Sequence, residues 1–174
     1  MYYFCEMKIL PAELSDVDEL LRLQSLAYRS EAERYGDWSI PPLTETAIQL
    51  RLAFADTLVL KAVEQDIIVG SVRGQWRNEK VAVGRLFVAP SLQRRGVGSK
   101  LLVAIEAAFP LACCFELFTG AESEANLRLY QRHGYAVTER RRLSSQVTLA
   151  YLQKRRGQVV ENTSLGGSKA LRLG

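Results

Sequence analysis

The segment 93–100, Gln-Arg-Arg-Gly-Val-Gly-Ser-Lys, carries the residue types that bind anions. It follows an apolar run at 81–88 that predicts a strand, and it opens onto an amphipathic stretch that predicts a helix. Backbone N–H groups at the start of a helix are unpaired and carry the positive end of the helix dipole. Gly96 and Gly98 have no Cβ, so a ligand can approach the main chain closely. The segment therefore predicts an anion site, and a pyrophosphate suits it best.

The spacing of the glycines excludes two common phosphate-binding motifs. A dinucleotide fingerprint needs a third glycine, which is missing after Gly98, and a P-loop needs a glycine directly before its lysine, whereas Ser99 precedes Lys100. The segment instead resembles motif A of the GNAT superfamily of N-acetyltransferases, Gln/Arg-x-x-Gly-x-Gly/Ala after a strand that ends in Val-x-Pro. The sequence from Val88 to Gly98 fits every fixed position of that motif. A plain strand-to-helix turn with solvated arginines is the alternative interpretation.

A second motif lies about thirty residues further on, where 123–135 predicts a short helix that Gly134 ends. Asn126 and Tyr130 are four residues apart and share one face of this helix. The pattern resembles motif B of the same superfamily, Asn-x-x-x-x-Tyr-x-x-x-Gly-Phe/Tyr, with one residue fewer between Asn and Tyr. The resemblance implies that Asn126 binds the pantetheine arm of acetyl-CoA and that the Tyr130 hydroxyl protonates the departing thiolate. A tyrosine that only packs in the core is the alternative.

The resemblance covers about 7–152 and implies an α/β (α+β) fold, a single GNAT-fold domain whose mixed central sheet of about seven strands is flanked by about four helices. That fold has a V-shaped splay between its fourth and fifth strands, here 81–88 and 113–118, and the pantetheine lies in the gap. Main-chain groups of the fourth strand then pair with the pantetheine amides, and the glycine-bearing segment holds the pyrophosphate. The residues so implied for the coenzyme are Leu86, Phe87, Val88, Gln93, Arg94, Arg95, Gly96, Val97, Gly98, Ser99, Lys100 and Asn126.

The residue that removes a proton from the acceptor amine is harder to assign. Many members of the superfamily place a glutamate on the strand before motif A, but 81–88 contains no carboxylate. Glu116 on the facing strand is the first candidate, because a carboxyl group among apolar neighbours has a raised pKa that suits a base. Glu31, Glu33 and a water chain without a dedicated base are the alternatives. The predicted catalytic pair is therefore Tyr130, as general acid, and Glu116.

The acceptor pocket of this fold is bordered by the segment between the first two helices, here 29–42. That segment is rich in acids and aromatic residues, of which Glu31, Tyr35 and Trp38 are the predicted substrate contacts. Such side chains suit a small cationic amine through charge pairing and cation–π contact. The prediction is a small-molecule amine, with an amino acid, a polyamine, an aminoglycoside and a protein N-terminus all left open.

The remaining elements surround these motifs in the order β-α-α-β-β-β-α-β-α-β-β. A short strand at 8–10 precedes a helix that starts near a capping-box-like Ser15-Asp-Val-Asp18, and a second helix is expected from Thr44 after a break at 39–42. Strands 58–63 and 67–75 form a hairpin around Gln65 and Asp66. The helix after motif A is expected to bury Val97, Leu101, Ile105 and Ala108, and strands 135–142 and 146–152 close the sheet. The domain is placed at 1–152, and 153–174 is expected to be a tail.

Composition agrees with one soluble domain in the cytoplasm. The 174 residues are 48% hydrophobic and 24% charged, no apolar run is long enough to span a bilayer, and the N-terminus lacks the features of a signal peptide. Cys5, Cys113 and Cys114 have no metal-ligand spacing with the single His133, so no metal is predicted and all three are expected to be buried thiols on strands.

The basic residues raise the question whether the chain binds nucleic acid. The net charge of +4 arises in 139–174, which holds 8 Lys/Arg against 2 Asp/Glu, whereas 1–138 holds 15 against 17. These clusters are expected to be solvated strand ends and tail, so nucleic acid is an unlikely partner, although a nucleic-acid-binding protein stays an alternative. An acyl-CoA sensor without turnover is the other alternative, because of the missing strand glutamate. The closing hairpin also offers a surface for a homodimer.

Overall fold

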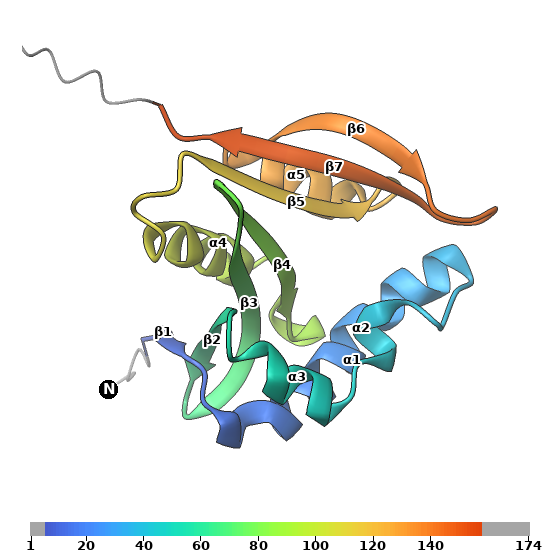
Figure 1. The fold of residues 1–174 in the computed structure, drawn as a ribbon. Helices are drawn as coiled ribbons and strands as arrows, with labels where there is room; N and C mark the ends of the chain where they lie inside the picture. Colours follow the sequence, from blue (N-terminus) through green and yellow to red (C-terminus); the bar gives the residue numbers. More distant parts are fainter. Residues whose placement is uncertain (1–5, 158–174) are drawn as a thin grey trace, which may run out of the picture.

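The computed structural model describes residues 6–157, which form a seven-stranded sheet with the order β1-β2-β3-β4-β5-β7-β6 (Figure 1). β4 and β5 run parallel, and every other pair of neighbours runs antiparallel. The strands are β1 (Lys8–Pro11), β2 (Leu58–Glu64), β3 (Ile67–Arg77), β4 (Lys80–Val88), β5 (Cys114–Gly120), β6 (Ala136–Arg142) and β7 (Thr148–Arg155). The mixed sheet of the predicted fold class is confirmed. Cys5 and the tail at 158–174 lie outside the described residues.

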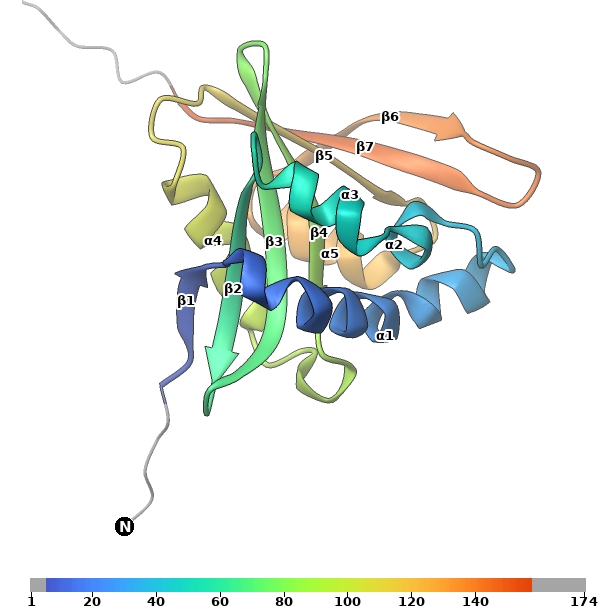
Figure 2. The same cartoon turned by 60° about the horizontal axis from the view of Figure 1, so that its bottom comes forward.

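Helices cover both faces of the sheet. They are α1 (Val17–Tyr35), α2 (Pro41–Thr44), α3 (Ala47–Ala53), α4 (Val97–Ala107) and α5 (Glu124–Arg132), with short 3-10 turns at Leu14–Asp16 and Pro90–Leu92. Figures 1 and 2 show α1, α2 and α3 on one face and α4 and α5 on the other. No helix within 6–157 is long and apolar enough to cross a membrane.

Each layer of helices has its own apolar core. On one face, α4 buries Leu101, Leu102 and Ile105 completely, together with side chains of β2 to β5. On the other face, Leu20 of α1 and Leu50 of α3 pack on β2, β3 and β4. Burial of a large aliphatic side chain stabilises a fold by about 1.5–3 kcal/mol. These two cores fix the helices on the sheet and hold the edges of β4 and β5 in place.

β4 and β5 separate soon after they meet. Their parallel pairing is limited to Val81 with Phe115 and Ala82 with Glu116. Beyond this point β4 pairs with β3 alone, while β5 follows β7, so the two strands diverge (Figure 1). The predicted splay between the fourth and fifth strands is thus confirmed, and among residues 6–157 no strand pairs with the outer edge of 83–88.

The first helix is longer than the sequence suggested. α1 continues to Tyr35, so Glu31, Glu33 and Tyr35 lie on its last turns and not in a connecting segment. An ion pair between Glu31 and Arg34 supports this end, and Gly36 stops the helix in the left-handed conformation at φ 62°. At the other end of α1, the backbone N–H of Glu13 bonds to Asp16, so the capping interaction lies before the expected Ser15.

The second predicted helix is in fact two. Pro41 and Pro42 begin the single turn of α2, because proline is tolerated in the first turn of a helix, where its missing N–H is not needed. Glu45 is extended and separates the two elements. Thr46 then caps α3 through a capping box with Gln49, so the helix expected from Thr44 starts three residues later, at Ala47.

The end of β7 is part of the fold, since the strand continues to Arg155 and not to 152. Lys154 pairs with Glu106 of α4 at 2.6 Å. The Arg156 guanidinium donates to carbonyl oxygens at the end of that helix, including those of Glu106 and Phe109. Two of the basic residues expected to be solvated are therefore structural.

Two smaller expectations at the end of α4 are wrong. Ala108 is exposed, because α4 ends before it and the chain turns away towards β5. Cys113 precedes β5 and is also exposed, whereas Cys114 is buried as expected.

Candidate active site

The free edge of β4 is shaped by a β-bulge. Ser71 of β3 pairs with Phe87 and Arg73 pairs with Gly84, so Arg85 and Leu86 together face a single residue of β3. Arg85 has φ 47°, a left-handed conformation that is strained for any residue with a Cβ other than Asn or Asp. The bulge bends β4 at the point where it separates from β5. Residues before and after the bulge therefore line the two cavities described below.

The segment after β4 presents the start of α4. Arg94 and Gly96 have positive φ angles of 62° and 83°, and Gly96 is the residue directly before the helix. A Cβ on Gly96 would have no atom within 4 Å, so the space around this residue does not require a glycine. The positive φ angle favours one. The first N–H groups of α4 lie beyond this turn and point out of the helix.

A cavity of about 780 Å³ runs from the free edge of β4 to this helix start, and we call it the strand-edge cleft. Helices α1 and α5 supply its other sides, with Arg34 from α1 and Arg128 and Arg132 from α5. Its lining therefore joins an unpaired strand edge, a helix start and several guanidinium groups. This combination fits a long ligand with amide groups in the middle and phosphates at one end.

Most residues predicted for the coenzyme line the strand-edge cleft. Those that do are Leu86, Phe87, Val88, Gln93, Arg94, Gly96, Gly98, Ser99 and Asn126. Arg95, Val97 and Lys100 do not. The Val97 side chain belongs to the core under α4, and Arg95, before the helix, and Lys100, in its first turn, are exposed.

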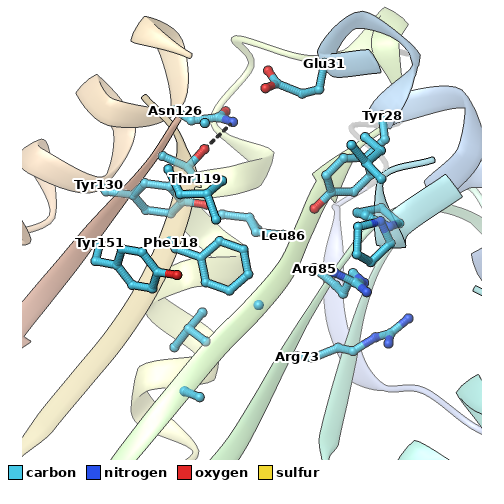
Figure 3. A pocket seen from close by; sticks show the side chains of 18 of the residues that line it. Tyr28, Glu31, Arg73, Arg85, Leu86, Phe118, Thr119, Asn126, Tyr130 and Tyr151 are labelled. Carbon is cyan, nitrogen blue, oxygen red and sulfur yellow. Dashed lines mark hydrogen bonds between the residues drawn. The ribbon is translucent and has the colours of Figure 1, made fainter. Parts of the chain in front are cut away.

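A second cavity of about 580 Å³ lies on the other side of the bulge. We call it the arginine pocket, because Arg73, Arg77 and Arg85 line it. Figure 3 shows Arg73 and Arg85 on one wall, opposite Phe118 and Tyr151. Apolar side chains make up much of the remaining wall.

Five residues line both cavities and mark the place where they meet. These residues are Tyr28, Glu31, Leu86, Asn126 and Tyr130. They come from α1, β4 and α5, so the junction is built where the three elements converge (Figure 3). A ligand in the strand-edge cleft and a second ligand in the arginine pocket would touch each other here.

Tyr130 is held deep in this junction. Its side chain packs against the core under α4, and its ring makes an edge contact with Tyr135. Burial, with smaller contributions from Tyr28 and Glu31, raises the pKa of the Tyr130 hydroxyl above its ordinary value. The neighbouring Asn126 side chain donates a hydrogen bond to Thr119 at 3.2 Å. Tyr130 is therefore a protonated phenol at neutral pH.

The three carboxylates considered as bases are in very different places. Glu31 lies at the junction, where its Oε1 accepts hydrogen bonds from Arg34 and from the Ser123 hydroxyl. Glu33 is exposed and borders neither cavity. Glu116 sits beside the β4–β5 contact and pairs with Lys80 at 3.2 Å, also away from both cavities. The structure does not bring Glu116 together with Tyr130.

Of the other two predicted substrate contacts, Tyr35 lines a cavity and Trp38 does not. Tyr35 lines the arginine pocket, and its hydroxyl accepts a hydrogen bond from the Glu122 N–H at 3.0 Å. The ring lies directly over Gly120, where a Cβ would come within 2.7 Å of ring carbons, so only glycine fits there. Trp38 is 56% exposed and lines neither cavity.

A buried ionic network underlies the arginine pocket. Arg73 donates to both oxygens of Glu45, at 2.7 and 2.8 Å, and Gln24 donates to the same carboxylate at 2.9 Å. Burial on its own would raise the pKa of Glu45, but these hydrogen bonds and the charges of Arg73 and Arg85 hold it below its ordinary value. Glu45 is therefore ionised.

Sequence reasoning missed four residues of this site. Tyr28 lies within α1, outside the predicted motifs, and nevertheless borders both cavities. Arg73, Arg85 and Glu45 also lie outside the predicted motifs. Arg73 interrupts the apolar alternation of its strand, and a charged residue in a buried strand was the available signal.

Comparisons with known proteins address the fold and the family. A family model described as the acetyltransferase (GNAT) family matches residues 17–135. No curated protein sequence matches the chain.

Solved structures resemble the fold at low sequence identity. The PaiA N-acetyltransferase of Thermoplasma acidophilum, in complex with coenzyme A, superimposes with a TM-score of 0.73 at 14% identity, covering 87% of this chain and 99% of that one. The ribosomal-protein-S18-alanine N-acetyltransferase of Escherichia coli has a TM-score of 0.73 at 16% identity, covering 90% and 98%. YncA of Salmonella typhimurium, described as a putative acetyltransferase with its cofactor acetyl-CoA, has a TM-score of 0.70 at 19% identity, covering 88% and 96%.

Proposed function

The chain belongs to the acetyltransferase (GNAT) family, and on this basis we propose that it transfers the acetyl group of acetyl-CoA to the primary amine of a small molecule. The observation that carries this proposal is the junction of the two cavities. Tyr130, a protonated phenol, and Glu31, a carboxylate, both lie where a ligand of the strand-edge cleft would meet a ligand of the arginine pocket.

The strand-edge cleft suits acetyl-CoA. The free edge of β4 at 83–88 offers main-chain groups that would pair with the amides of the pantetheine arm. The N–H groups at the start of α4 would bind the pyrophosphate, with Arg94, Arg128 and Arg132 available for the phosphate charges. Asn126 borders the same cleft near the junction. Two of the structural neighbours described above were crystallised with coenzyme A or acetyl-CoA, which supports this assignment.

The reaction requires three proton movements. An acceptor ammonium group gives a proton to Glu31, directly or through water, and the free amine attacks the thioester carbonyl carbon. The C–S bond then breaks, the acetyl group stays on the nitrogen, and the coenzyme thiolate takes a proton from the Tyr130 hydroxyl. The nitrogen gives up its second proton as the amide forms, and through water this proton restores the Tyr130 hydroxyl. A phenol with a raised pKa is protonated at neutral pH and can act as this general acid.

Two structural observations argue against a nucleic-acid-binding role. Lys154 and Arg156 of the basic C-terminal region are bound to Glu106 and to the end of α4, so their charges are used within the fold. The guanidinium groups of Arg34, Arg94, Arg128 and Arg132 border the strand-edge cleft, and those of Arg73, Arg77 and Arg85 border the arginine pocket. Both cavities are too small for a duplex.

The test is a titration followed by a turnover assay. Isothermal titration of the full chain with acetyl-CoA should give micromolar binding, and an amine panel should then release free thiol in proportion to the acetylated product. Absence of binding to acetyl-CoA and to other acyl-CoA thioesters would refute the proposal. Binding without thiol release from any amine would favour an acyl-CoA sensor.

A further inference from the structure

The arginine pocket holds more positive charge than its own carboxylate neutralises. Glu45 has one negative charge and faces two guanidinium groups. Arg73 forms two hydrogen bonds with it, whereas Arg85 reaches it only with Nε at 3.8 Å, beyond hydrogen-bond distance. The group of three therefore keeps a net charge of +1, and the unbalanced charge belongs to Arg85.

Within residues 6–157, Arg85 also has an N–H donor without a hydrogen-bond acceptor. Its Nε is buried and has no hydrogen-bond partner within the described part of the chain, and the same is true of the Arg73 Nε. The Arg85 side chain is 25% exposed, so most of the group has lost its contact with water. A buried donor without an acceptor costs about 1–3 kcal/mol, and more when it is charged. The fold bears this cost together with the strained φ of 47° at the same residue.

The remaining wall of the pocket offers Arg85 no other anion. Glu31 is the one carboxylate that lines the pocket in the described structure, and it lies at the junction with its Oε1 already bound to Arg34 and Ser123. Arg77 adds a further positive charge, with Gln75 as its hydrogen-bond partner. The opposite wall is apolar and aromatic, with Phe118, Leu149 and Tyr151 among its residues (Figure 3 labels Phe118 and Tyr151).

From these features we infer that the acceptor is an amine that also carries a carboxylate, as an amino acid does, and that Arg85 binds this carboxylate. The inference rests on the acetyl transfer proposed above and names the class of its acceptor. The amino group lies at the junction beside Glu31 and Tyr130, the carboxylate lies against Arg85, and an apolar side chain packs on the wall that contains Phe118. Among the acceptors that the sequence left open, this inference selects an amino acid over a polyamine or an aminoglycoside.

The physical basis is the balance of charge. A carboxylate at the part of the Arg85 guanidinium that faces the arginine pocket neutralises the excess charge in a site shielded from water. An acceptor without a carboxylate leaves that charge unpaired. Sites built to pair with a polar group discriminate strongly against analogues that lack it, because their own buried groups then go unsatisfied.

The experiment compares each of a panel of α-amino acids with its carboxamide and with its decarboxylated amine, using thiol release at fixed acetyl-CoA. The carboxamide keeps the size and removes the charge. For at least one apolar amino acid, kcat/KM should exceed that of its carboxamide by about 10- to 100-fold. In Arg85→Asn, whose asparagine tolerates the left-handed backbone angle, the ratio should fall to about 2-fold or less. Arg140→Asn, on the exposed strand β6, is the matched control and should keep the preference of the parent.

A binding measurement gives a second readout that is independent of turnover. With coenzyme A present, an N-acetylamino acid should bind more tightly than its carboxamide, and Arg85→Asn should remove that difference. Equal use of acids and carboxamides, or acetylation of amines without a carboxylate only, would overturn the inference while leaving the proposed acetyl transfer intact. Failure of every amine to release thiol would instead refute the acetyl transfer itself.

Discussion

Tyr130 on α5 and Tyr28 on α1 face each other across the junction of the strand-edge cleft and the arginine pocket (Figure 3). Burial raises the pKa of Tyr28 to about 12, and it raises that of Tyr130 as well, with Tyr28 itself contributing to the second shift. Both phenols are therefore protonated at neutral pH. They differ in their neighbours, since Tyr130 lies with Asn126 on α5, whereas the Tyr28 ring contacts Phe87.

Replacing Tyr130 separates catalysis from binding. Tyr130→Phe should lower kcat by at least about 100-fold, because the departing thiolate loses its proton donor, while the Kd for acetyl-CoA should change by about 2-fold or less. Tyr135→Phe is the matched control, since it removes another buried tyrosine hydroxyl, one that bonds to Glu106 and lies outside both cavities. An unchanged kcat in Tyr130→Phe would exclude this residue as the general acid.

Glu31 and Glu33 provide a test of the base on one helix. Glu31→Gln should lower kcat/KM by about 100-fold near pH 7, because the amide cannot accept the proton from the acceptor ammonium. The loss should shrink as the pH approaches the pKa of the amine, where free amine becomes abundant. Glu33→Gln, two residues away and exposed, should behave as the parent. A loss in Glu31→Gln that stays constant with pH would indicate a structural role for this carboxylate.

Gly96 allows the anion site to be tested with two nearly isosteric variants. Asp and Asn both tolerate the left-handed backbone conformation found there, and a Cβ at this position meets no neighbouring atom. Gly96→Asp should bind acetyl-CoA about tenfold more weakly than Gly96→Asn, because only the first places a negative charge beside the pyrophosphate. The comparison is made by isothermal titration. Equal affinities would mean that the phosphates do not lie at the start of α4.

Glu45 predicts how stability depends on pH. Its pKa in the folded protein lies below the ordinary value of 4.5, so its contribution to stability is fully present above that value and is lost as the pH falls through the folded-state pKa. In Glu45→Gln, the unfolding free energy should therefore fall less between pH 7 and pH 3 than it does in the parent. At pH 7 the variant should be less stable by about 3 kcal/mol, because Arg73 and Arg85 are left without their carboxylate.

Chemical denaturation of the parent and Glu45→Gln at pH 3 to 7 measures both effects. Arg51→Gln serves as the control, since its contact with Asp18 is long and exposed and should contribute little. Parallel stability curves for parent and Glu45→Gln over this range would contradict the assignment.

The parts of the site that lie in short continuous motifs could be predicted from the sequence. Gly96, Gly98, Asn126 and Tyr130 each stand in a local pattern whose backbone requirement is visible in the neighbouring residues, and all four line the strand-edge cleft. The order of strands and helices followed from the same local patterns, apart from the division between α2 and α3.

The arginine pocket could not be predicted in this way. Arg73 contacts Glu45 and Gln24 across 28 and 49 residues of sequence, and Arg85 is turned by a bulge that depends on the register between β3 and β4. Such contacts exist only once the sheet has formed. The end of α1 is a different case, because the helix-forming residues before Gly36 are a local signal for a longer helix that the prediction of a connecting segment at 29–42 did not use.

The hydroxyl of Tyr35 and the carboxylate of Glu31 have a mechanical consequence. They bond to Glu122 and Ser123 respectively, and so they join α1 to the turn between β5 and α5 across the mouth of the splay. The bond at Tyr35 contributes about 0.5–1.5 kcal/mol and the bond to the Glu31 carboxylate about 1.5–3 kcal/mol, whereas the opposite end of the splay is held by the pairing of β4 with β5. The two ends of the splay are therefore tied differently, one by two side-chain hydrogen bonds and the other by the backbone of the sheet.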